Sequence, residues 1–244
     1  MSILVSDFDC TYDKHHHDIE LNRVAIQKFI EAGNYFVLSS SRPLNSLLRK
    51  VKEHDIPYNY LGTCDGNYLF DSKLNRIYSC TIPSEIVLEI KKLANIRGVE
   101  GLQYVYPTSY SINFDENEPL GSVAFVVKDE NVTPEFIEMF NRLKTNYPDF
   151  QYKRDGNRGI GYYKIRPLGL SKSNPITFLG ESLQIPKSDI YTIGDEENDF
   201  EMIRDFNGFR VSHNKELKEV ALKRYRSVHD LVDDITNNTA LKRW

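Results

Sequence analysis

The sequence has few cysteines and lacks long hydrophobic runs. Only three of its 244 residues are cysteine, and none of them forms the C-x-x-C spacing of a metal or redox site. An odd number of scattered cysteines indicates free thiols in a reducing compartment and argues against a disulfide framework. No apolar run approaches the roughly 20 residues of a membrane-spanning helix, so we expect no membrane partner. Because the first apolar run, residues 3–5, begins a core strand and not a signal peptide, we expect a cytoplasmic protein.

An excess of basic residues is also missing. The 31 Lys and Arg residues are outnumbered by 35 Asp and Glu, and the resulting net charge of −4 argues against nucleic acid as a partner. A hydrophobic fraction of 40% and an aromatic fraction of 12% are ample for a packed core. We therefore expect a globular protein that is a monomer or a weak homodimer.

Two separate regions of the chain alternate buried strands with amphipathic helices. Short apolar runs predict strands, and apolar residues at helical spacing predict helices. The expected strands are residues 3–5, 35–38, 58–61, 190–193 and 208–211. The expected helices are residues 18–32, 44–51, 172–183 and 200–203, with a last one from about residue 230. This alternation predicts an α/β core with a Rossmann-like, doubly wound parallel sheet.

The region between these two follows a different pattern. Its expected strands show alternation, which is typical of antiparallel sheets. They are residues 102–114, 123–127, 150–153 and 162–165, and helices are expected at 83–94 and 136–143. We therefore predict a discontinuous core domain, residues 1–80 and 166–244, interrupted by an α+β domain at residues 81–165.

Polar side chains cluster where the predicted strands end or helices begin. The residues concerned are Asp7, Asp9, Ser40, Lys172, Asp195, Asn198 and Asp199. Because the carboxyl ends of parallel strands meet at one edge of a sheet, we expect these groups to converge there. Each has an ordinary structural alternative, as a turn residue, a helix cap or a solvated lysine.

Together these groups suit phosphoryl transfer. A carboxylate can act as nucleophile and form an aspartyl-phosphate. Carboxylates as close as Asp7 and Asp9 repel each other unless a cation joins them or one keeps its proton, which suggests both a metal and an acid/base role. Mg²⁺ is the natural cation for oxygen ligands, and hydroxyl and ammonium groups can hold the transferred group.

The same segments resemble the four motifs of the haloacid dehalogenase superfamily. Residues 7–11, DFDCT, match D-x-D-x-T, and residues 37–43, VLSSSRP, resemble the second motif with Ser40 at its Ser/Thr position. Lys172 is similar to the third motif, and residues 194–202, GDEENDFEM, are similar to G-D-x-x-N-D-x-x-M. This fourth motif, with the insert, resembles the Cof-type phosphatase branch that has a type-II cap.

The resemblance implies a catalytic role for four residues. Asp7 would be the nucleophile and a metal ligand. Asp9 would be the general acid and base, and its backbone carbonyl would bind Mg²⁺. Ser40 would hydrogen-bond the phosphoryl group, and Lys172 would neutralise it.

The resemblance also implies the remaining ligands. Asp195 would be the other metal carboxylate, and Asp199 would bind the metal directly or through another ligand. Asn198 would orient the phosphoryl group or the lysine, and Ser41 and Arg42 would bind substrate.

Three residues depart from the family pattern. Cys10 and Ser41 stand where the family usually has glycine, so the turn that contains Cys10 must tolerate a side chain. Asp65 stands where asparagine is common, which affects one substrate-side contact.

The end of the insert is basic. Its basic residues are Lys153, Arg154, Arg158, Lys164 and Arg166. Arg154 and Lys164 are our candidates for contacts to an anionic or sugar-phosphate leaving group, and the alternative is an ordinary solvated strand edge.

The expected function is Mg²⁺-dependent hydrolysis of a small phosphomonoester, such as a sugar phosphate or related metabolite, through an aspartyl-phosphate. One alternative is a phosphomutase of the same fold, similar to phosphomannomutase. Another is a non-catalytic ligand-binding descendant, although the presence of Asp7, Asp9, Lys172 and Asp195 argues against it. The sequence does not choose among phosphorylated metabolites.

Overall fold

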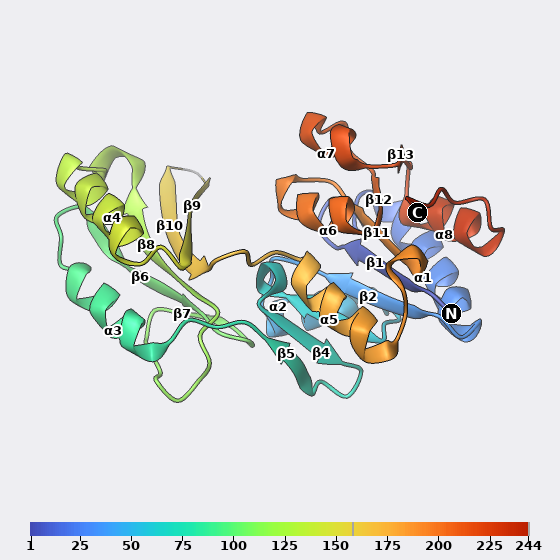
Figure 1. Cartoon of the computed structure of the whole chain (residues 1–244), viewed down its shortest axis with the longest axis horizontal. Coiled ribbons are helices and arrows are strands. Elements are labelled where there is room, and N and C mark those ends of the chain that lie inside the picture. The colour runs from blue at the N-terminus through green and yellow to red at the C-terminus, as the bar shows by residue number, and fades with distance from the viewer. Residues whose placement is uncertain (158, 244) are drawn as a thin grey trace. The chain divides into compact units, whose positions relative to one another are not determined.

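The computed structural model describes residues 1–157 and 159–243 of the chain (Figure 1). They form two compact units, which we call the core (Met1–Ser79 with Ser171–Trp244) and the insert (Cys80–Leu170). The insert starts one residue before and ends five residues after the predicted range 81–165, because its last strand runs to Pro167. No helix in the described ranges has the length and hydropathy needed to cross a bilayer.

The core contains one eight-stranded sheet in the order β13-β12-β11-β1-β2-β3-β4-β5. All neighbouring strands from β13 through β3 pair in parallel. β4 pairs antiparallel with β3, and β5 pairs antiparallel with β4. The strands are β1 (Ile3–Asp7), β2 (Tyr35–Ser39), β3 (Tyr60–Thr63), β4 (Tyr68–Asp71), β5 (Arg76–Ser79), β11 (Ile190–Gly194), β12 (Asn207–Arg210) and β13 (Lys223–Arg224). The chain order runs outward from β1 on both sides, so the end of β1 lies at the switch point where such sheets bind ligands.

Helices pack against the core sheet and bury its central strand. They are α1 (His16–Glu31), α2 (Leu44–Glu53), α5 (Ser173–Leu183), α6 (Phe200–Asp205), α7 (Lys215–Val220) and α8 (Val228–Thr236). Ile3 and Val5 of β1 belong to one apolar cluster with Ile176 of α5 and Ile203 of α6. Every residue of β1 is buried, and because side chains alternate along a strand, both faces of the sheet are covered there.

The hairpin formed by β4 and β5 was not predicted. Both strands are short: β4 is buried, whereas β5 is a partly exposed edge strand that carries little hydrophobic pattern. Its turn is closed by Asp71, whose Oδ1 accepts hydrogen bonds from the N–H groups of Lys73 (2.9 Å) and Asn75 (2.8 Å). The sequence also failed to predict α7 and the two-residue strand β13. The β4–β5 hairpin gives the otherwise parallel sheet one antiparallel edge.

The insert is a five-stranded antiparallel sheet in the order β7-β6-β8-β10-β9. Its elements are α3 (Ser84–Leu93), β6 (Val99–Val105), β7 (Tyr110–Ser111), β8 (Ser122–Lys128), α4 (Pro134–Asn146), β9 (Phe150–Asn157) and β10 (Ile160–Pro167). The predicted strand at 102–114 is in fact divided, since β6 ends at Val105 and β7 covers only two residues.

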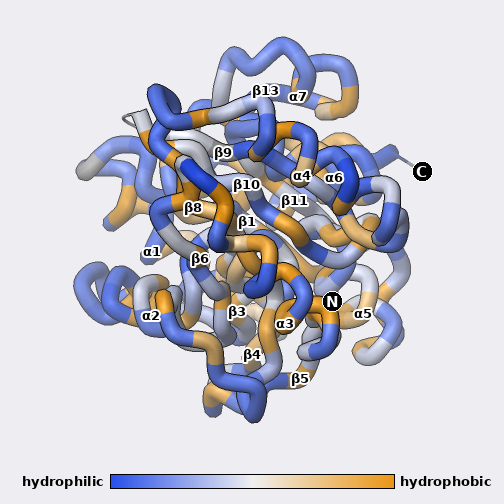
Figure 2. The backbone as a smooth tube through the Cα atoms, turned by 90° about the vertical axis from the view of Figure 1, so that its left-hand side faces the viewer, coloured by the Kyte–Doolittle hydropathy of each residue, from blue (hydrophilic) through white to orange (hydrophobic). Residues whose placement is uncertain are grey.

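One face of the insert's sheet is covered by α3 and α4, which lie on the same side of it in Figure 1. Aromatic rings hold α4 to the sheet: Phe136 and Phe140 pack edge-on against Tyr163 of β10, with ring centroids 4.7 and 5.3 Å apart. Hydrophobic and hydrophilic stretches alternate along helices such as α2 and α4 in Figure 2, as expected of helices with one buried face.

Candidate active site

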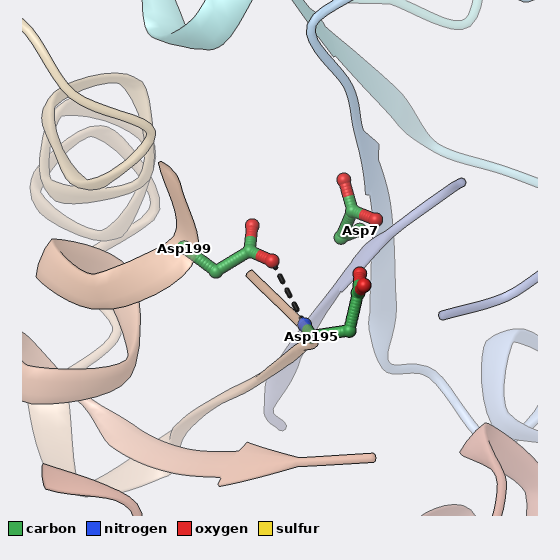
Figure 3. A group of neighbouring side chains, drawn as sticks. All are labelled: Asp7, Asp195 and Asp199. Carbon is green, nitrogen blue, oxygen red and sulfur yellow. Dashed lines mark hydrogen bonds between the residues drawn. The ribbon is translucent and has the colours of Figure 1, made fainter. Parts of the chain in front are cut away.

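The carboxyl ends of β1 and β11 bring aspartates together. β1 ends at Asp7, and Asp195 directly follows Gly194, the last residue of the neighbouring parallel strand β11. Asp199 joins them from the short 3-10 helix Glu197–Asp199. One carboxylate oxygen of each aspartate lies within 4.8 Å of the others (Figure 3), and Asp199 is fully buried.

Backbone groups fix the Asp199 carboxylate. Its Oδ2 accepts hydrogen bonds from the N–H groups of Asp195 (2.9 Å, dashed in Figure 3) and Glu196 (3.3 Å). Gly194 makes room for it, because a Cβ atom at that position would lie 2.4 Å from the carboxyl carbon of Asp199. The loop after β11 therefore holds this side chain in one orientation.

Lys172 is buried at the centre of the cluster. It precedes α5, is fully buried, and its Nζ donates to Oδ1 of Asp7 (2.6 Å) and Oδ1 of Asp199 (2.7 Å). Burial alone would lower the pKa of the ammonium, but the charges of Asp199 and Asp7 outweigh burial and hold this pKa above its usual range. Lys172 is thus a permanent buried cation, and the alternative of a solvated lysine does not apply.

Negative charge exceeds positive charge in this cluster. The cluster holds three carboxylates, of which Asp7 and Asp199 contact its one ammonium, so full ionisation leaves two negative charges uncompensated. Burial raises the pKa of Asp7 well above its ordinary value, and the neighbouring charge of Asp199 adds to this rise while Lys172 opposes it. Burial also raises the pKa of Asp195 to about 6. Oxygen ligands with an excess of two negative charges fit a hard divalent cation.

Two hydroxyl groups hold Asp195, and neither was singled out from the sequence. Thr11 Oγ1 donates to Asp195 Oδ1 (2.8 Å), and Ser212 Oγ donates to the Asp195 carbonyl (2.6 Å). Thr11 is part of the D-x-D-x-T pattern, which could have identified it. Nothing in the sequence distinguishes Ser212 from other serines.

Asp9 is paired with Arg42. The guanidinium donates from Nε to Asp9 Oδ2 (2.9 Å) and from Nη2 to Oδ1 (2.6 Å), which is the two-pronged geometry typical of arginine and carboxylates. The side chain of Asp9 is 44% exposed, unlike that of Asp7. Between Asp9 and Thr11, Cys10 has a φ of +59°, so the turn does take a side chain in the left-handed region that favours glycine.

Ser40 is buried at the end of β2, beside β1. Its N–H donates to the Gly62 carbonyl (2.9 Å), and its Oγ accepts from the N–H of Arg42 (3.2 Å). The N-cap of α2 is Pro43, so Ser40 does not cap that helix. Ser41, which follows it, is exposed.

Asn198 contacts a residue that lies outside the four motifs. Its Nδ2 donates to Oδ1 of Asp65, 3.1 Å away, in the loop after β3. The structure therefore brings Asp65, noted above only as a departure from the family pattern, to the edge of the aspartate cluster.

The two candidate residues of the insert lie on opposite faces of its sheet. Arg154 pairs in register with Tyr163, on the face covered by α4, and forms an ion pair with Asp129 (2.5 Å). Lys164 pairs with Lys153, and because neighbouring residues of a strand alternate, both lysines are on the other face. Arg158 lies outside the described residues.

Comparison with known proteins identifies the family. Residues 4–130 and 102–230 match the family model for haloacid dehalogenase-like hydrolases, and these two ranges together cover most of the chain. The chain belongs to this family. Among curated proteins it is similar to the 5-amino-6-(5-phospho-D-ribitylamino)uracil phosphatase YcsE of Bacillus subtilis, with 22% identity over 188 residues, which cover 75% of this chain and 72% of the relative.

Solved structures share the fold of this hydrolase. A hypothetical protein from Geobacillus kaustophilus has a TM-score of 0.75 and 19% identity, over 96% of this chain and 98% of that one. The haloacid dehalogenase subclass IIB sugar phosphatase BT4131 has a TM-score of 0.70 and 16% identity, over 99% of this chain and all (100%) of that one.

These findings confirm the predicted family, the fold class with its inserted cap, and the enzyme class, a haloacid dehalogenase-type phosphatase or hydrolase. Family membership and the aspartate cluster together indicate a divalent metal, and the family implies a small phosphorylated metabolite as substrate.

Proton and metal binding should compete at Asp195. Because its pKa is raised from 3.8 to about 6, the metal-free native state binds more protons than the unfolded chain between these values. The free energy of unfolding should therefore fall, by up to about 3 kcal/mol, as the pH rises through this window. Mg²⁺ displaces those protons, so we expect it to raise the midpoint of thermal unfolding more at pH 7 than at pH 5.

Thermal unfolding with and without Mg²⁺ at several pH values measures this competition. The variant Asp195→Asn is the control and should lose the part of the pH dependence that Asp195 contributes, while the raised pKa of Asp7 contributes its own part. Equal stabilisation of the original protein by Mg²⁺ at pH 5 and pH 7 would contradict the role assigned to Asp195.

Proposed function

We propose that this chain is a Mg²⁺-dependent phosphatase that hydrolyses a small phosphomonoester through an aspartyl-phosphate on Asp7. The observation that supports the proposal most strongly is the position of the Asp7 carboxylate. It ends the central strand at the switch point of the sheet, next to a buried ammonium and two further carboxylates. The proposed nucleophile, the proposed cation site and the positive charge proposed to hold the phosphoryl group are thus members of one cluster.

Carboxylate oxygens of Asp7 and Asp195 would hold Mg²⁺, and the backbone carbonyl of Asp9 is proposed as a further ligand. When bound, the cation would supply neutralisation of the phosphoryl oxygens. Asp199 is committed to Lys172 and to two backbone N–H groups. We therefore propose that Asp199 acts on the metal indirectly, by holding Lys172 and the loop that carries Asp195.

Lys172 and Ser40 would hold the transferred phosphoryl group. The ammonium of Lys172 already touches the nucleophile, so it can follow negative charge as it moves from Asp7 to the phosphoryl oxygens. Ser40 is buried at the end of the strand beside β1, and its hydroxyl can donate a hydrogen bond to one of those oxygens. Ser41 and Asn198 are proposed as further contacts.

Asp9 would protonate the leaving oxygen and later accept a proton from the attacking water. In the structure, its carboxylate is occupied by Arg42. Arginine binds phosphates with the same fork geometry, so an incoming phosphoryl group would compete for Arg42. We propose that substrate draws the guanidinium away and leaves Asp9 able to transfer protons.

The substrate is proposed to be a sugar phosphate or a related metabolite. The name of the curated relative is that of a phosphatase acting on a phosphorylated ribitylaminouracil. One structural neighbour is described as a sugar phosphatase. In the insert, Lys164 opposes Lys153, on the face of the sheet away from α4. We propose that Lys164 binds a polar or anionic part of the substrate.

Replacing the nucleophile tests the reaction class. Asp7→Asn keeps an oxygen acceptor for Lys172 but removes the nucleophilic charge, so phosphate release should fall by about 10³-fold or more while the fold is retained. The measurement is phosphate release from a panel of phosphomonoesters with and without Mg²⁺. Substantial hydrolysis by Asp7→Asn would contradict the assignment, and isomerisation of a sugar phosphate with little phosphate release would favour a phosphomutase.

Replacing lysine on the insert tests the substrate proposal. With the best ester of the panel, Lys164→Gln should raise KM by about tenfold and leave kcat within a few-fold, because the proposed contact is to a non-reacting part of the substrate. Arg154→Gln is the matched control, since Arg154 lies on the opposite face of the same sheet. Equal changes in KM for both variants would contradict a specific role for Lys164.

A further inference from the structure

The loop after β3 has an unusual backbone that is tied to the proposed phosphoryl site. Cys64, Asp65 and Gly66 have consecutive φ values of +55°, +56° and +99°. Side-chain-bearing residues keep such values only where the surrounding structure holds them. Here the N–H of Cys64 donates to the Arg42 carbonyl (3.0 Å), and the N–H of Asp65 donates to the Ser40 carbonyl (3.2 Å).

The other side of this loop rests on the peptide that carries Lys172. A Cβ atom on Gly66 would lie 2.0 Å from the carbonyl oxygen of Ser171 and 3.0 Å from the backbone nitrogen of Lys172. Only glycine permits this approach. The loop is therefore wedged between the end of β2 and the start of α5, with Asp65 at its centre.

The side chain of Asp65 reaches the fourth motif. Asn198 Nδ2 donates to Asp65 Oδ1 across 3.1 Å, although the two residues are 133 positions apart in the chain. Burial lowers the pKa of Lys172, but the charges of nearby carboxylates more than offset this effect. Asp65 is the third of these carboxylates, after Asp199 and Asp7. Asp65 therefore acts on both the amide and the ammonium of the site.

We propose that Asp65 is a positioning residue that orients the Asn198 amide toward the phosphoryl group and adds a third negative charge near Lys172, after those of Asp199 and Asp7. The proposal rests on the phosphatase function proposed above. Its two parts differ physically. An asparagine at position 65 could still accept the hydrogen bond from Asn198, but it would carry no charge. The negative charge of Asp65 opposes the binding of a phosphate anion, so its removal should favour binding.

Three single variants and one double variant separate the two parts. Asp65→Asn removes the charge and keeps an acceptor, Asp65→Ala removes both, and Asn198→Ala removes the oriented amide. The double variant Asp65→Ala/Asn198→Ala closes a mutant cycle. Each is compared by kcat and KM, by its thermal midpoint, and by calorimetric binding of inorganic phosphate in the presence of Mg²⁺.

The expected pattern has three elements. Asp65→Ala should lower kcat/KM by about tenfold, the size of a lost hydrogen bond to a charged group, and Asp65→Asn should recover most of that loss. In the Asn198→Ala background, Asp65→Ala should cause little further loss. Asp65→Asn should bind inorganic phosphate about fivefold more tightly than the original protein, because one nearby negative charge is gone.

Three results would overturn the proposal. The orienting role would be excluded if Asp65→Asn lowered kcat/KM as much as Asp65→Ala does. It would also be excluded if the losses in the double variant were fully additive. Unchanged phosphate affinity in Asp65→Asn would exclude the role of the charge. Phosphate binding needs no turnover, so this arm remains informative if the original protein hydrolyses none of the esters, a result that would count against the phosphatase function instead.

Discussion

The site depends on one buried ammonium shared between two carboxylates. Lys172 is fully buried, and Asp7 and Asp199 are both within 2.7 Å of its nitrogen. A buried lysine without partners would lose its charge, and buried aspartates without a cation would take up protons. Lys172 therefore stabilises the charged form of both aspartates and they stabilise its charge, whereas the two carboxylates repel each other. The remaining negative charge creates the demand for a divalent cation. Removing any one member changes the ionisation of the whole cluster.

The fold supplies this arrangement through a few tight backbone contacts. Parallel pairing of β1 with β11 puts Asp7 beside the loop that begins at Asp195. That loop turns back so closely that Gly194 has no room for a side chain next to Asp199. The loop after β3 approaches the start of α5 just as closely at Gly66. The side chains of the site are thus held by strand ends and short loops of the core, which keeps the cluster organised before any ligand binds.

The sequence was sufficient to predict much of the fold and the residues of the cluster, because both are encoded in local patterns. Buried strands and amphipathic helices have recognisable spacings, and the four motifs each lie in a short segment. Contacts between segments far apart in the chain could not be predicted from the sequence. Thr11 and Asp195 are 184 positions apart, and no local signal pairs them. Likewise, the opposite faces of Arg154 and Lys164 follow from the register of β9 and β10. The β4–β5 hairpin was missed because both strands are only four residues long and β5, a partly exposed edge strand, carries little hydrophobic pattern.

Transfer of the phosphoryl group to Asp7 is the step on which the proposed reaction depends. The most direct measurement is rapid quenching of a single turnover with a phosphate-labelled ester, followed by digestion and mass spectrometry of the labelled peptide. We expect a transient acyl-phosphate on the peptide that contains residues 3–13, located at Asp7 and formed and lost at rates compatible with turnover. Full phosphate release without a labelled protein, or a label on any other residue, would contradict it.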